Sequence, residues 1–434
     1  MNGSVAPGTP CVPDAREYAT LQALPHAARA LFGQDAFSTL DWYETIIRWA
    51  LPPGASACFH VVGKDDRVAA VVPLLRHGRH LSALTTPYTC FWQPLLAEGA
   101  NPEAVGIALA SLWRRHAVIR LDCTDDGPIM TGIATGLRRR GLHSLFFDHF
   151  GDWHLPTPGT SYEAYLAARP GQLRHGIVRH TRRLIQNKGA TFTLVTGEPG
   201  LEAAIAVYET VYAASWKEPE PSPHFNPMLM RRAAAAGTLR LGLLHLAGQP
   251  IAAQFWLKHG NWAVMLKVAY DEAYATLSPG NVLSGQILQH LLDQEHITEF
   301  DFGRGDDAYK QDWTGERRQR RGVLVANPLT AGGAVEILRK KASSPFLKKR
   351  TKKILSVWSA KARTKVFCFF FSKKKALPCL PHQPRPYPDP PCWSCQECPK
   401  SLCQTAPVAP SRRPSPARRS RPPSAPAWLA RLSP

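Results

Sequence analysis

The sequence predicts an α/β fold built from two similar halves, each a mixed sheet flanked by helices, with a basic tail at the end. Three observations lead to this prediction. A helix followed by a β-hairpin occurs in each half, the second half continues with a strand, a helix and a strand, and the last hundred residues differ in composition from the rest. Switching between helical and strand periods is typical of α/β domains.

The first half opens with a predicted helix and hairpin. Thr39 to Ala50 has the apolar spacing of a helix, and Phe59 to Val62 and Arg67 to Leu75 flank a Gly-Lys-Asp-Asp turn. The remaining predicted elements are helices at Ala104 to His116 and Ile129 to Arg140 and a strand at Val118 to Leu121, and Phe146 to His154 leads out of the first half. A domain boundary is expected near Pro156 to Ser161.

The second half repeats this order. A helix predicted at Glu202 to Trp216 precedes a hairpin formed by Leu239 to Leu246 and Pro250 to Leu257, which flank an Ala-Gly-Gln turn. The repetition indicates a duplication. Strands are then predicted at Trp262 to Tyr270 and Thr298 to Phe302.

A helix between these two strands is predicted from the period of its leucines and isoleucine. Leu283, Ile287 and Leu291 recur at four-residue steps, and Leu288 and Leu292 lie beside them. The opposite face is expected to carry the polar residues Ser284, Gln286, Gln289 and Asp293.

The start of this helix is the strongest functional signal in the chain. Ser278 is expected to cap the first-turn amides, Pro279 suits the first helical position, and Gly280 lets a ligand approach the backbone. A helix start that faces a strand end commonly binds phosphate groups. An ordinary buried helix with a Ser cap explains the same residues.

Charge is unevenly distributed along the chain. Of 53 Lys and Arg residues, 22 follow Glu336, together with only Asp389 and Glu397 among 33 acidic residues, so that the preceding part holds 31 of each sign. The net charge of +20 therefore belongs to the tail and does not describe the partners of the main body.

These shifts predict four segments. Residues 1–156 and 157–330 are expected to form the two domains, 331–365 a basic helical or extended segment, and 366–434 a disordered Pro-, Arg- and Ser-rich tail. A functional tail would bind nucleic acid or anionic lipid. The abrupt change of composition instead favours a frameshifted or read-through gene end.

Cysteine usage does not predict a disulfide framework or a metal centre. Six of the ten cysteines lie in the tail, where Cys392, Cys395 and Cys398 have C-x2-C-x2-C spacing without a second paired motif. The other four lack framework spacing, which fits a reducing compartment. Because no stretch resembles a signal peptide or a membrane span, a cytoplasmic protein is expected.

From about Ser161 to Asn327, the chain resembles the GNAT-like acetyltransferases of bacterial exopolysaccharide and cellulose biosynthesis, relatives of the Fem-type peptidoglycan-bridge transferases. The first half fits the more divergent partner domain, including Phe37 to Trp49 and Thr86-Pro87-Tyr88. The matching segments of the second half are, in order, SYEAYLAARPGQLRHGIVRHTRRLIQNKG, Ala214-Ser215-Trp216-Lys217, the hairpin with Gly248 and Ala252, Ser278-Pro279-Gly280, and Phe300-Asp301-Phe302-Gly303-Arg304-Gly305-Asp306 with Tyr309, Lys310 and Trp313.

The resemblance implies two tandem GNAT-like domains and acyl transfer to an amine or hydroxyl of a small-molecule or glycan acceptor. The donor would be acetyl-CoA or another acyl-CoA, bound as a substrate and not as a permanent cofactor. Its pyrophosphate is expected at the residues of the helix start, namely Ser278, Pro279, Gly280, Asn281 and Val282.

One departure from the family pattern keeps other donors open. The usual Arg or Gln followed by spaced glycines is replaced by Leu277-Ser278-Pro279-Gly280-Asn281, which has a single glycine. Fem-type relatives use aminoacyl-tRNA, so a tRNA-borne donor is the first alternative. A catalytically silent accessory protein of exopolysaccharide synthesis is the second.

Direct acyl transfer needs a base, a proton donor and positioning groups. Asp301, Asp306 and Asp307 are candidates for the base, and Tyr270 for protonation of the thiolate. The candidate substrate-binding residues are Trp216, Lys217, Arg304 and Lys310. Turn formation after Gly305, strand packing and surface salt bridges explain these residues equally well.

Other functional classes find little support in the sequence. The arginines between Arg169 and Lys188 lie on a helix without interleaved aromatic residues, so nucleic-acid binding is not expected there. No phosphate loop, nucleophile elbow or paired-His zinc motif occurs, which excludes the common kinase, serine hydrolase and metalloprotease patterns. No metal ligands are predicted, and the oligomeric state is left open.

Overall fold

The computed structural model describes residues 14–64 and 67–343. The tail predicted at 366–434, its cysteines and most of the predicted basic segment lie outside the described residues. Of that basic segment, the structure describes a helix, α11 (Ala331–Ser343).

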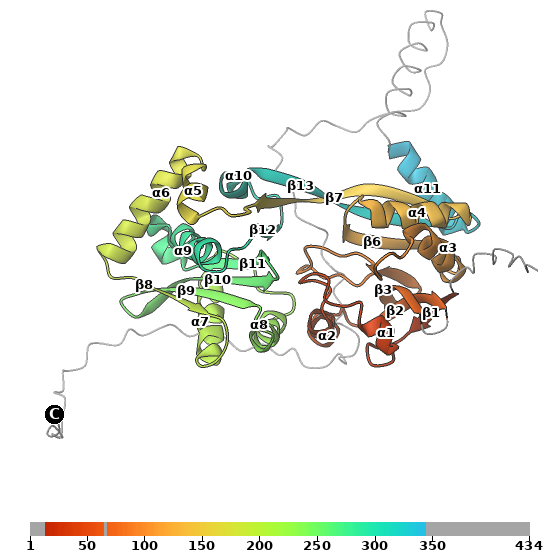
Figure 1. The fold of residues 1–434 in the computed structure, drawn as a ribbon, viewed down its shortest axis with the longest axis horizontal. Coiled ribbons are helices and arrows are strands. Elements are labelled where there is room, and N and C mark those ends of the chain that lie inside the picture. The colour runs from red at the N-terminus through yellow and green to blue at the C-terminus, as the bar shows by residue number, and fades with distance from the viewer. Residues whose placement is uncertain (1–13, 65–66, 344–434) are drawn as a thin grey trace, which may run out of the picture. The chain divides into compact units, whose positions relative to one another are not determined.

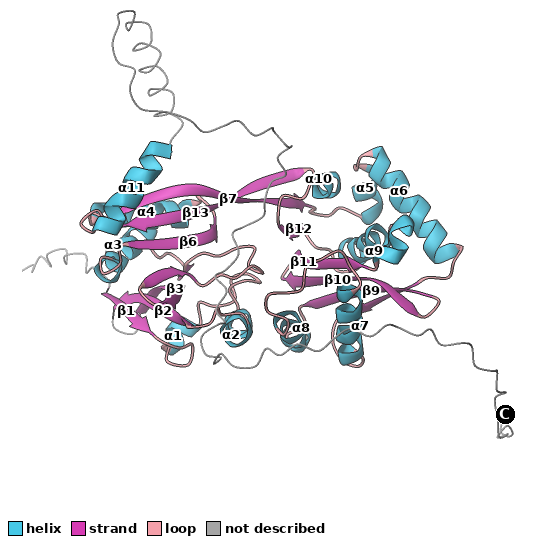
Figure 2. Cartoon of the chain, turned by 180° about the vertical axis from the view of Figure 1, so that it is seen from behind, coloured by secondary structure: helices cyan, strands magenta, loops and turns pink. Residues whose placement is uncertain are grey.

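A long mixed sheet runs through both halves (Figures 1 and 2). Its strand order is β1-β2-β3-β4-β6-β13-β7-β12-β11-β10-β9-β8, and β5 pairs with β3. The first-half strands are β1 (Asp14–Tyr18), β2 (Ala55–Lys64), β3 (Arg67–His77), β4 (His80–Ala83), β5 (Leu95–Leu96), β6 (Val118–Thr124) and β7 (His143–Pro156). The later strands are β8 (Thr191–Val195), β9 (Leu239–Leu246), β10 (Gln249–His259), β11 (Trp262–Tyr270), β12 (Glu299–Arg304) and β13 (Glu316–Ala326).

The predicted helices are present to within a few residues, and the structure adds α1, α8, η2 and α10, which were not predicted. Those of the first half are α1 (His26–Arg29), α2 (Leu40–Trp49), α3 (Pro102–Trp113) and α4 (Pro128–Arg139). Those of the second half are α5 (Tyr162–Ala167), α6 (Gly171–Thr181), the π-helical turn η1 (Arg182–Gln186), α7 (Leu201–Ala213), α8 (Phe225–Ala235), the 3-10 helix η2 (Glu272–Leu277), α9 (Pro279–Asp293) and α10 (Tyr309–Thr314).

The predicted duplication appears as a shared device in the two halves. In each half an antiparallel hairpin, β2-β3 or β9-β10, leads to a parallel pair with a helix in the connection. The parallel pairs are β4 with β6, connected through α3, and β11 with β12, connected through α9. Parallel strands require such a crossover.

Three apolar cores hold these layers together. One packs α3 and α4 on the first part of the sheet, and a second packs α5, α6 and α9 on β9 to β12. The third is shared between the halves, because it combines side chains of α1 and α2 with those of α7 and α8. The halves are therefore joined by side-chain packing as well as by strand pairing.

Strand β13 joins the two halves in a way that local sequence patterns do not predict. It pairs along its length with β7, and its second part also pairs with β6 of the first half. The far end of β7 in turn pairs with β12. Because the sheet is continuous across residue 156, the domain boundary placed there stays a prediction.

Candidate functional site

The helix α9 confirms the predicted apolar face and corrects the predicted polar face. Leu283, Ile287 and Leu291 are completely buried. Ser284, expected among the polar residues, is also buried, and its hydroxyl accepts a hydrogen bond from Nε2 of Gln254 on β10. Buried polar groups need such partners, so this pair fixes α9 to the sheet.

The expected Ser278 cap is wrong. Ser278 has left-handed backbone angles, φ 52° and ψ 47°, and its side chain makes no capping hydrogen bond. The reason is the preceding 3-10 helix η2, which ends at Leu277 and whose own start is capped by Asp271. The chain turns sharply at Ser278, and Pro279 then begins α9 as predicted. The first-turn amides of α9 therefore lack a side-chain cap.

A pocket of about 390 Å³ opens beside this helix start. It lies where the parallel strands β11 and β12 stop pairing, since their pairing covers only 262–264 and 299–301 while β11 continues to Tyr270. The lining residues are Trp216, Lys217, Met265, Val268, Tyr270, Gly280, Asn281, Ser284, Asp307 and Tyr309. Several residues predicted to bind donor or substrate are thus brought together in one cavity.

An aromatic stack forms one wall of the pocket. A Cβ at Gly280 would lie 3.2 Å from Cδ1 of Tyr270, so the absence of a side chain there lets the Tyr270 ring pack on the helix start. The ring of Trp216 packs on Tyr270 with a centroid separation of 4.5 Å. Nζ of Lys217 lies 5.3 Å from the Trp216 ring. The stack therefore runs from the start of α9 to the loop after α7.

Asp301, predicted as a base, lies in a buried ion cluster away from the residues that line the pocket. Its carboxylate pairs with Arg318 and accepts the amide N–H of Gly303 at 2.6 Å. Arg318 also pairs with Asp152 of β7 at 2.6 Å. Burial, followed by the charge of Asp152, raises the pKa of Asp301. The cluster joins β7, β12 and β13, which indicates a structural role.

The aspartates after Gly305 separate into two environments. Asp306 pairs with Arg317 at 2.6 Å and accepts a hydrogen bond from Nε1 of Trp153 at 3.0 Å, so its position does not favour a catalytic role. Asp307 lines the pocket and lies 3.1 Å from Nζ of Lys310. Of the three candidate aspartates, Asp307 alone lines this cavity.

Lys310 and Arg304, predicted to bind substrate, instead contact the protein backbone. The buried ammonium of Lys310 donates to the carbonyl oxygens of Gly303, Arg304 and Gly305. The guanidinium of Arg304 lies 4.7 Å from the ring of Phe150, outside the pocket lining. Lys310 therefore holds the turn that follows β12, whereas Arg304 donates to the carbonyl oxygens of Thr86 and Thr89 in the first half.

A polar cluster next to the pocket was not predicted as a unit. Glu220 pairs with Lys267 of β11 at 2.6 Å and accepts a hydrogen bond from Asn226. Lys267 lies 5.0 Å from the ring of Tyr88, which belongs to the first half. Thr86-Pro87-Tyr88 resembles part of the partner domain, but no sequence spacing connects Tyr88 with Glu220 or Lys267, which lie far from it along the chain.

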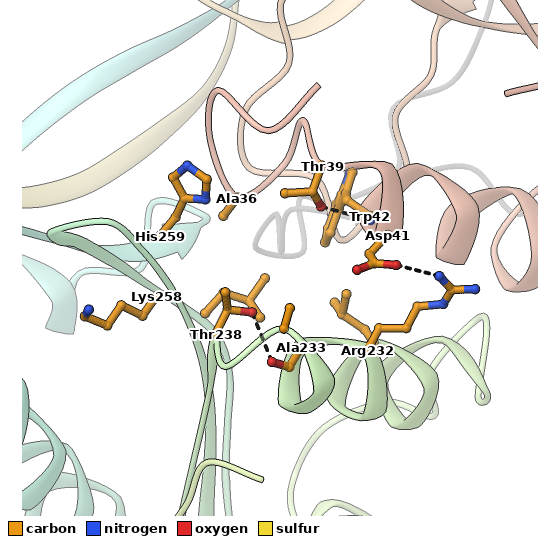
Figure 3. A pocket seen from close by; sticks show the side chains of 12 residues that line it. Ala36, Thr39, Asp41, Trp42, Arg232, Ala233, Thr238, Lys258 and His259 are labelled. Atoms are coloured by element: carbon orange, nitrogen blue, oxygen red, sulfur yellow. Dashed lines mark hydrogen bonds and ion pairs between the residues drawn. The ribbon is translucent and has the colours of Figure 1, made fainter. Parts of the chain in front are cut away.

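A second cavity lies between the halves, where α2 faces α8 (Figure 3). Its volume is about 60 Å³, which is room for a few water molecules at most. Arg232 closes one side by donating to Asp41 at 2.7 Å, and Thr238 bonds to the carbonyl of Ala233 (Figure 3). This cavity is too small for an acyl-CoA.

Residues 14–64 and 67–343 contain neither a candidate metal site nor a helix that could span a membrane. In that part of the chain, no cluster of three His, Cys, Asp or Glu side chains is arranged to hold a metal ion. None of its helices is both long and apolar enough to cross a lipid bilayer.

Comparison with protein families identifies a domain in the second half. Residues 171–311 match the family model described as "Acetyltransferase (GNAT) domain". The matched segment runs from α6 into α10 and includes every residue that lines the pocket, whereas strands β7 and β13 of the sheet lie outside it. Together with the repeated parallel pairs, the match confirms the predicted mixed α/β, GNAT-like fold.

Several solved structures resemble the chain at low sequence identity. A crystal structure of FemX has a TM-score of 0.49 at 13% identity, with 71% of this chain and 96% of that chain covered. L-PGS from Bacillus licheniformis has a TM-score of 0.41 at 12% identity, covering 63% and 85%. A tandem GNAT protein from the clavulanic acid biosynthesis pathway has a TM-score of 0.39 at 16% identity, covering 70% and 93%. No curated protein matches the chain.

Proposed function

We propose that this protein is an acyltransferase that moves an acyl group from acetyl-CoA or another acyl-CoA to an amine or hydroxyl. The observation that carries the proposal is the pocket at the point where β11 and β12 part, beside the uncapped start of α9. The GNAT match over 171–311 supports the same reaction class.

The residues present fit an acyl-CoA. The pyrophosphate would face the first turn of α9 at Gly280 and Asn281, where the helix dipole and amides without a side-chain cap favour negative charge. The pantetheine arm would extend along β11 beyond Val264, where this strand no longer pairs with β12. Backbone groups at such an edge need hydrogen-bond partners, which the amides of the arm supply.

The chemistry requires attack of the acceptor nitrogen or oxygen on the thioester carbonyl, a new bond to the acyl carbon, and departure of the CoA thiolate. Asp307, which lines the pocket, is positioned to accept the proton of the nucleophile. Tyr270, as predicted from the sequence, or Tyr309 would protonate the thiolate.

The donor site is tested by thermal unfolding of the full chain with acetyl-CoA. Saturating ligand at about a hundred times its Kd should stabilise the protein by about 2.7 kcal/mol, a shift of several degrees. Gly280→Trp should abolish the shift, because a Cβ there already meets Tyr270 at 3.2 Å. Asn281→Trp, at an exposed position of the pocket rim, should do the same with less risk to folding.

Gly176→Trp is the matched control for this experiment. It adds the same side chain to a helical glycine of α6 that has open space around it, outside the pocket. The variant should keep the full shift. No shift in the wild type, or an unchanged shift in both pocket variants, would contradict the acyl-CoA proposal.

A tRNA-borne aminoacyl donor is the second candidate. The surface of α6 and η1 favours it, contrary to the expectation from the sequence that this helix does not bind nucleic acid. Residues 164–197 contain no Asp or Glu. Four arginines of this segment line a shared groove together with His175, Val178 and Asn187, namely Arg174, Arg179, Arg182 and Arg183. Aminoacyl-tRNA that binds in a salt-dependent manner, with no response to acetyl-CoA, would favour this donor.

The biological setting is proposed from the resemblance alone. A role in polysaccharide or cell-envelope biosynthesis would make the acceptor a glycan or its small-molecule precursor. A catalytically silent accessory protein remains the alternative, and an open pocket that accepts acyl-CoA without any turnover would favour it.

A further inference from the structure

Lys217 places a positive charge in the pocket without an ion-pair partner. Its side chain lines the cavity from the loop between α7 and α8. Within the described residues, no carboxylate lies at ion-pairing distance from its Nζ. The ammonium makes a cation–π contact with the Trp216 ring. A partly buried ammonium without a counter-ion is unusual, because loss of water around the charge is unfavourable.

The acidic residues around Lys217 are each paired with another lysine. Asp307 is paired with Lys310 at 3.1 Å, and Glu220 is paired with Lys267 at 2.6 Å. Burial, followed by the positive charge of Lys267, lowers the pKa of Lys217. Around this part of the pocket, the three lysines Lys217, Lys267 and Lys310 therefore face two carboxylates, those of Asp307 and Glu220. One positive charge is left over, which an anionic ligand group would neutralise.

Lys217 lies at the opposite end of the aromatic stack from the proposed phosphate site. The rings of Tyr270 and Trp216 stand between the start of α9 and the ammonium. The same loop also contacts the first half, where the hydroxyl of Tyr88 accepts a hydrogen bond from the amide of Ser222 at 3.2 Å. This end of the pocket is thus the side on which an acceptor would meet the donor.

We infer that Lys217 binds a carboxylate or phosphate group of the acceptor, so that the enzyme selects an acceptor that carries both a nucleophile and a negative charge. The inference rests on the proposed function and narrows its acceptor class. A single ammonium does not distinguish the two anions by geometry, since lysine acts as a point charge.

The test compares matched amines that differ by one anionic group. Full-length protein is saturated with CoA, the product of the donor, so that no turnover occurs, and binding is measured by calorimetry. The pairs are glycine with glycinamide, for the carboxylate, and glucosamine 6-phosphate with glucosamine, for the phosphate. In at least one pair, the member that carries the carboxylate or phosphate should bind about tenfold more tightly than the member that lacks it.

Lys217→Gln should reduce this preference to less than about twofold while leaving CoA affinity unchanged. Lys188→Gln is the matched control, because Lys188 is exposed after η1 and outside the pocket. Its preference should equal that of the wild type. Melting temperatures of all three proteins without ligand show whether each variant is folded.

The outcomes separate the inference from the proposed function. If the wild type does not bind CoA, both fall. If CoA binds but neither pair shows a preference for its anionic member, or no amine binds, the inference alone is overturned. A Lys217→Gln variant that loses CoA affinity would assign Lys217 to the donor and would also overturn it.

Discussion

The two helices that connect the parallel strands begin in opposite ways. In the first half, Oδ1 of Asn101 accepts the amides of Glu103 and Ala104 at 2.9 and 3.3 Å, and Pro102 follows the cap. In the second half, α9 also begins with a proline, but Ser278 provides no side-chain cap. The connecting helix of the β-α-β unit therefore has a side-chain N-cap in the first half and none in the second half.

The difference teaches where function resides in a duplicated fold. A helix start that satisfies its own amides gains stability and has little left for a ligand, whereas an uncapped start gives up about 1 kcal/mol and keeps its donors available. The described pocket beside a connecting helix lies at α9. We therefore expect the proposed donor to bind at α9, in the second half.

Replacing Gly303 should have the largest effect. Gly303, near the end of β12, has φ +69°, and a Cβ there would lie 2.2 Å from the carbonyl oxygen of Met265. Gly303→Ala should lower the free energy of unfolding by about 3 kcal/mol, measured by urea denaturation, because strain and a backbone clash combine.

The first half offers a control for this substitution. Cys123, near the end of β6, has φ 62° and already carries a Cβ. Cys123→Ala keeps that Cβ and should cost only about 1 kcal/mol for the lost sulfur contacts. Equal losses of unfolding free energy in the two variants would contradict the clash that the structure predicts for a Cβ at Gly303.

Acid should weaken the first half more than the second. Buried His60 fixes α3 to β2, since its Nδ1 accepts a hydrogen bond from Nε1 of Trp113 at 2.9 Å. The corresponding pair in the second half, Gln254 with Ser284, does not titrate. Burial lowers the pKa of His60 to about 4.

In the unfolded chain, His60 has its ordinary pKa of about 6.5 and is protonated below that pH, whereas in the folded chain it stays neutral down to about pH 4. The free energy of unfolding therefore falls as the pH drops from about 6.5 towards 4. Between pH 7 and pH 5 the expected loss is about 2 kcal/mol, visible as faster amide exchange in α3 than in α9. In His60→Gln this pH slope should disappear. An equal acid response of α3 and α9 in the wild type would contradict the assignment.

Replacing the polar residue that precedes α3 or α9, Asn101 or Ser278, should have the smallest effect on stability, and it tests the two helix caps directly. Asn101→Ala should cost about 1 kcal/mol, because two amides lose their acceptor. Ser278→Ala should change the free energy of unfolding by less than about 0.5 kcal/mol, since no capping bond is lost. A larger loss for Ser278→Ala in urea denaturation would mean that α9 is capped after all.

Local patterns predicted the elements well. The four-residue steps of Leu283, Ile287 and Leu291 predicted α9, and alternation predicted both hairpins, because burial on one face imposes these periods. The Ser278 prediction was wrong because a cap depends on backbone angles set by η2, which the sequence does not display.

Contacts between segments far apart in the chain could not be predicted from the sequence, for a different reason. The insertion of β13 between β6 and β7 and the ion cluster of Asp301 with Arg318 join segments that no local period connects. For the same reason the three candidate aspartates could not be sorted by spacing, although only Asp307 lines the pocket. Trp216, Lys217 and Tyr270 were predicted from the sequence, and the structure shows that they form one stack.

Hydrogen exchange measured by mass spectrometry, with and without acetyl-CoA, tests the central comparison most directly. Ligand bound at the uncapped helix start should slow amide exchange in residues 265–270 and 279–283 and leave residues 101–105 unchanged. Protection at 101–105, or no protection at 279–283 with saturating ligand, would contradict the account.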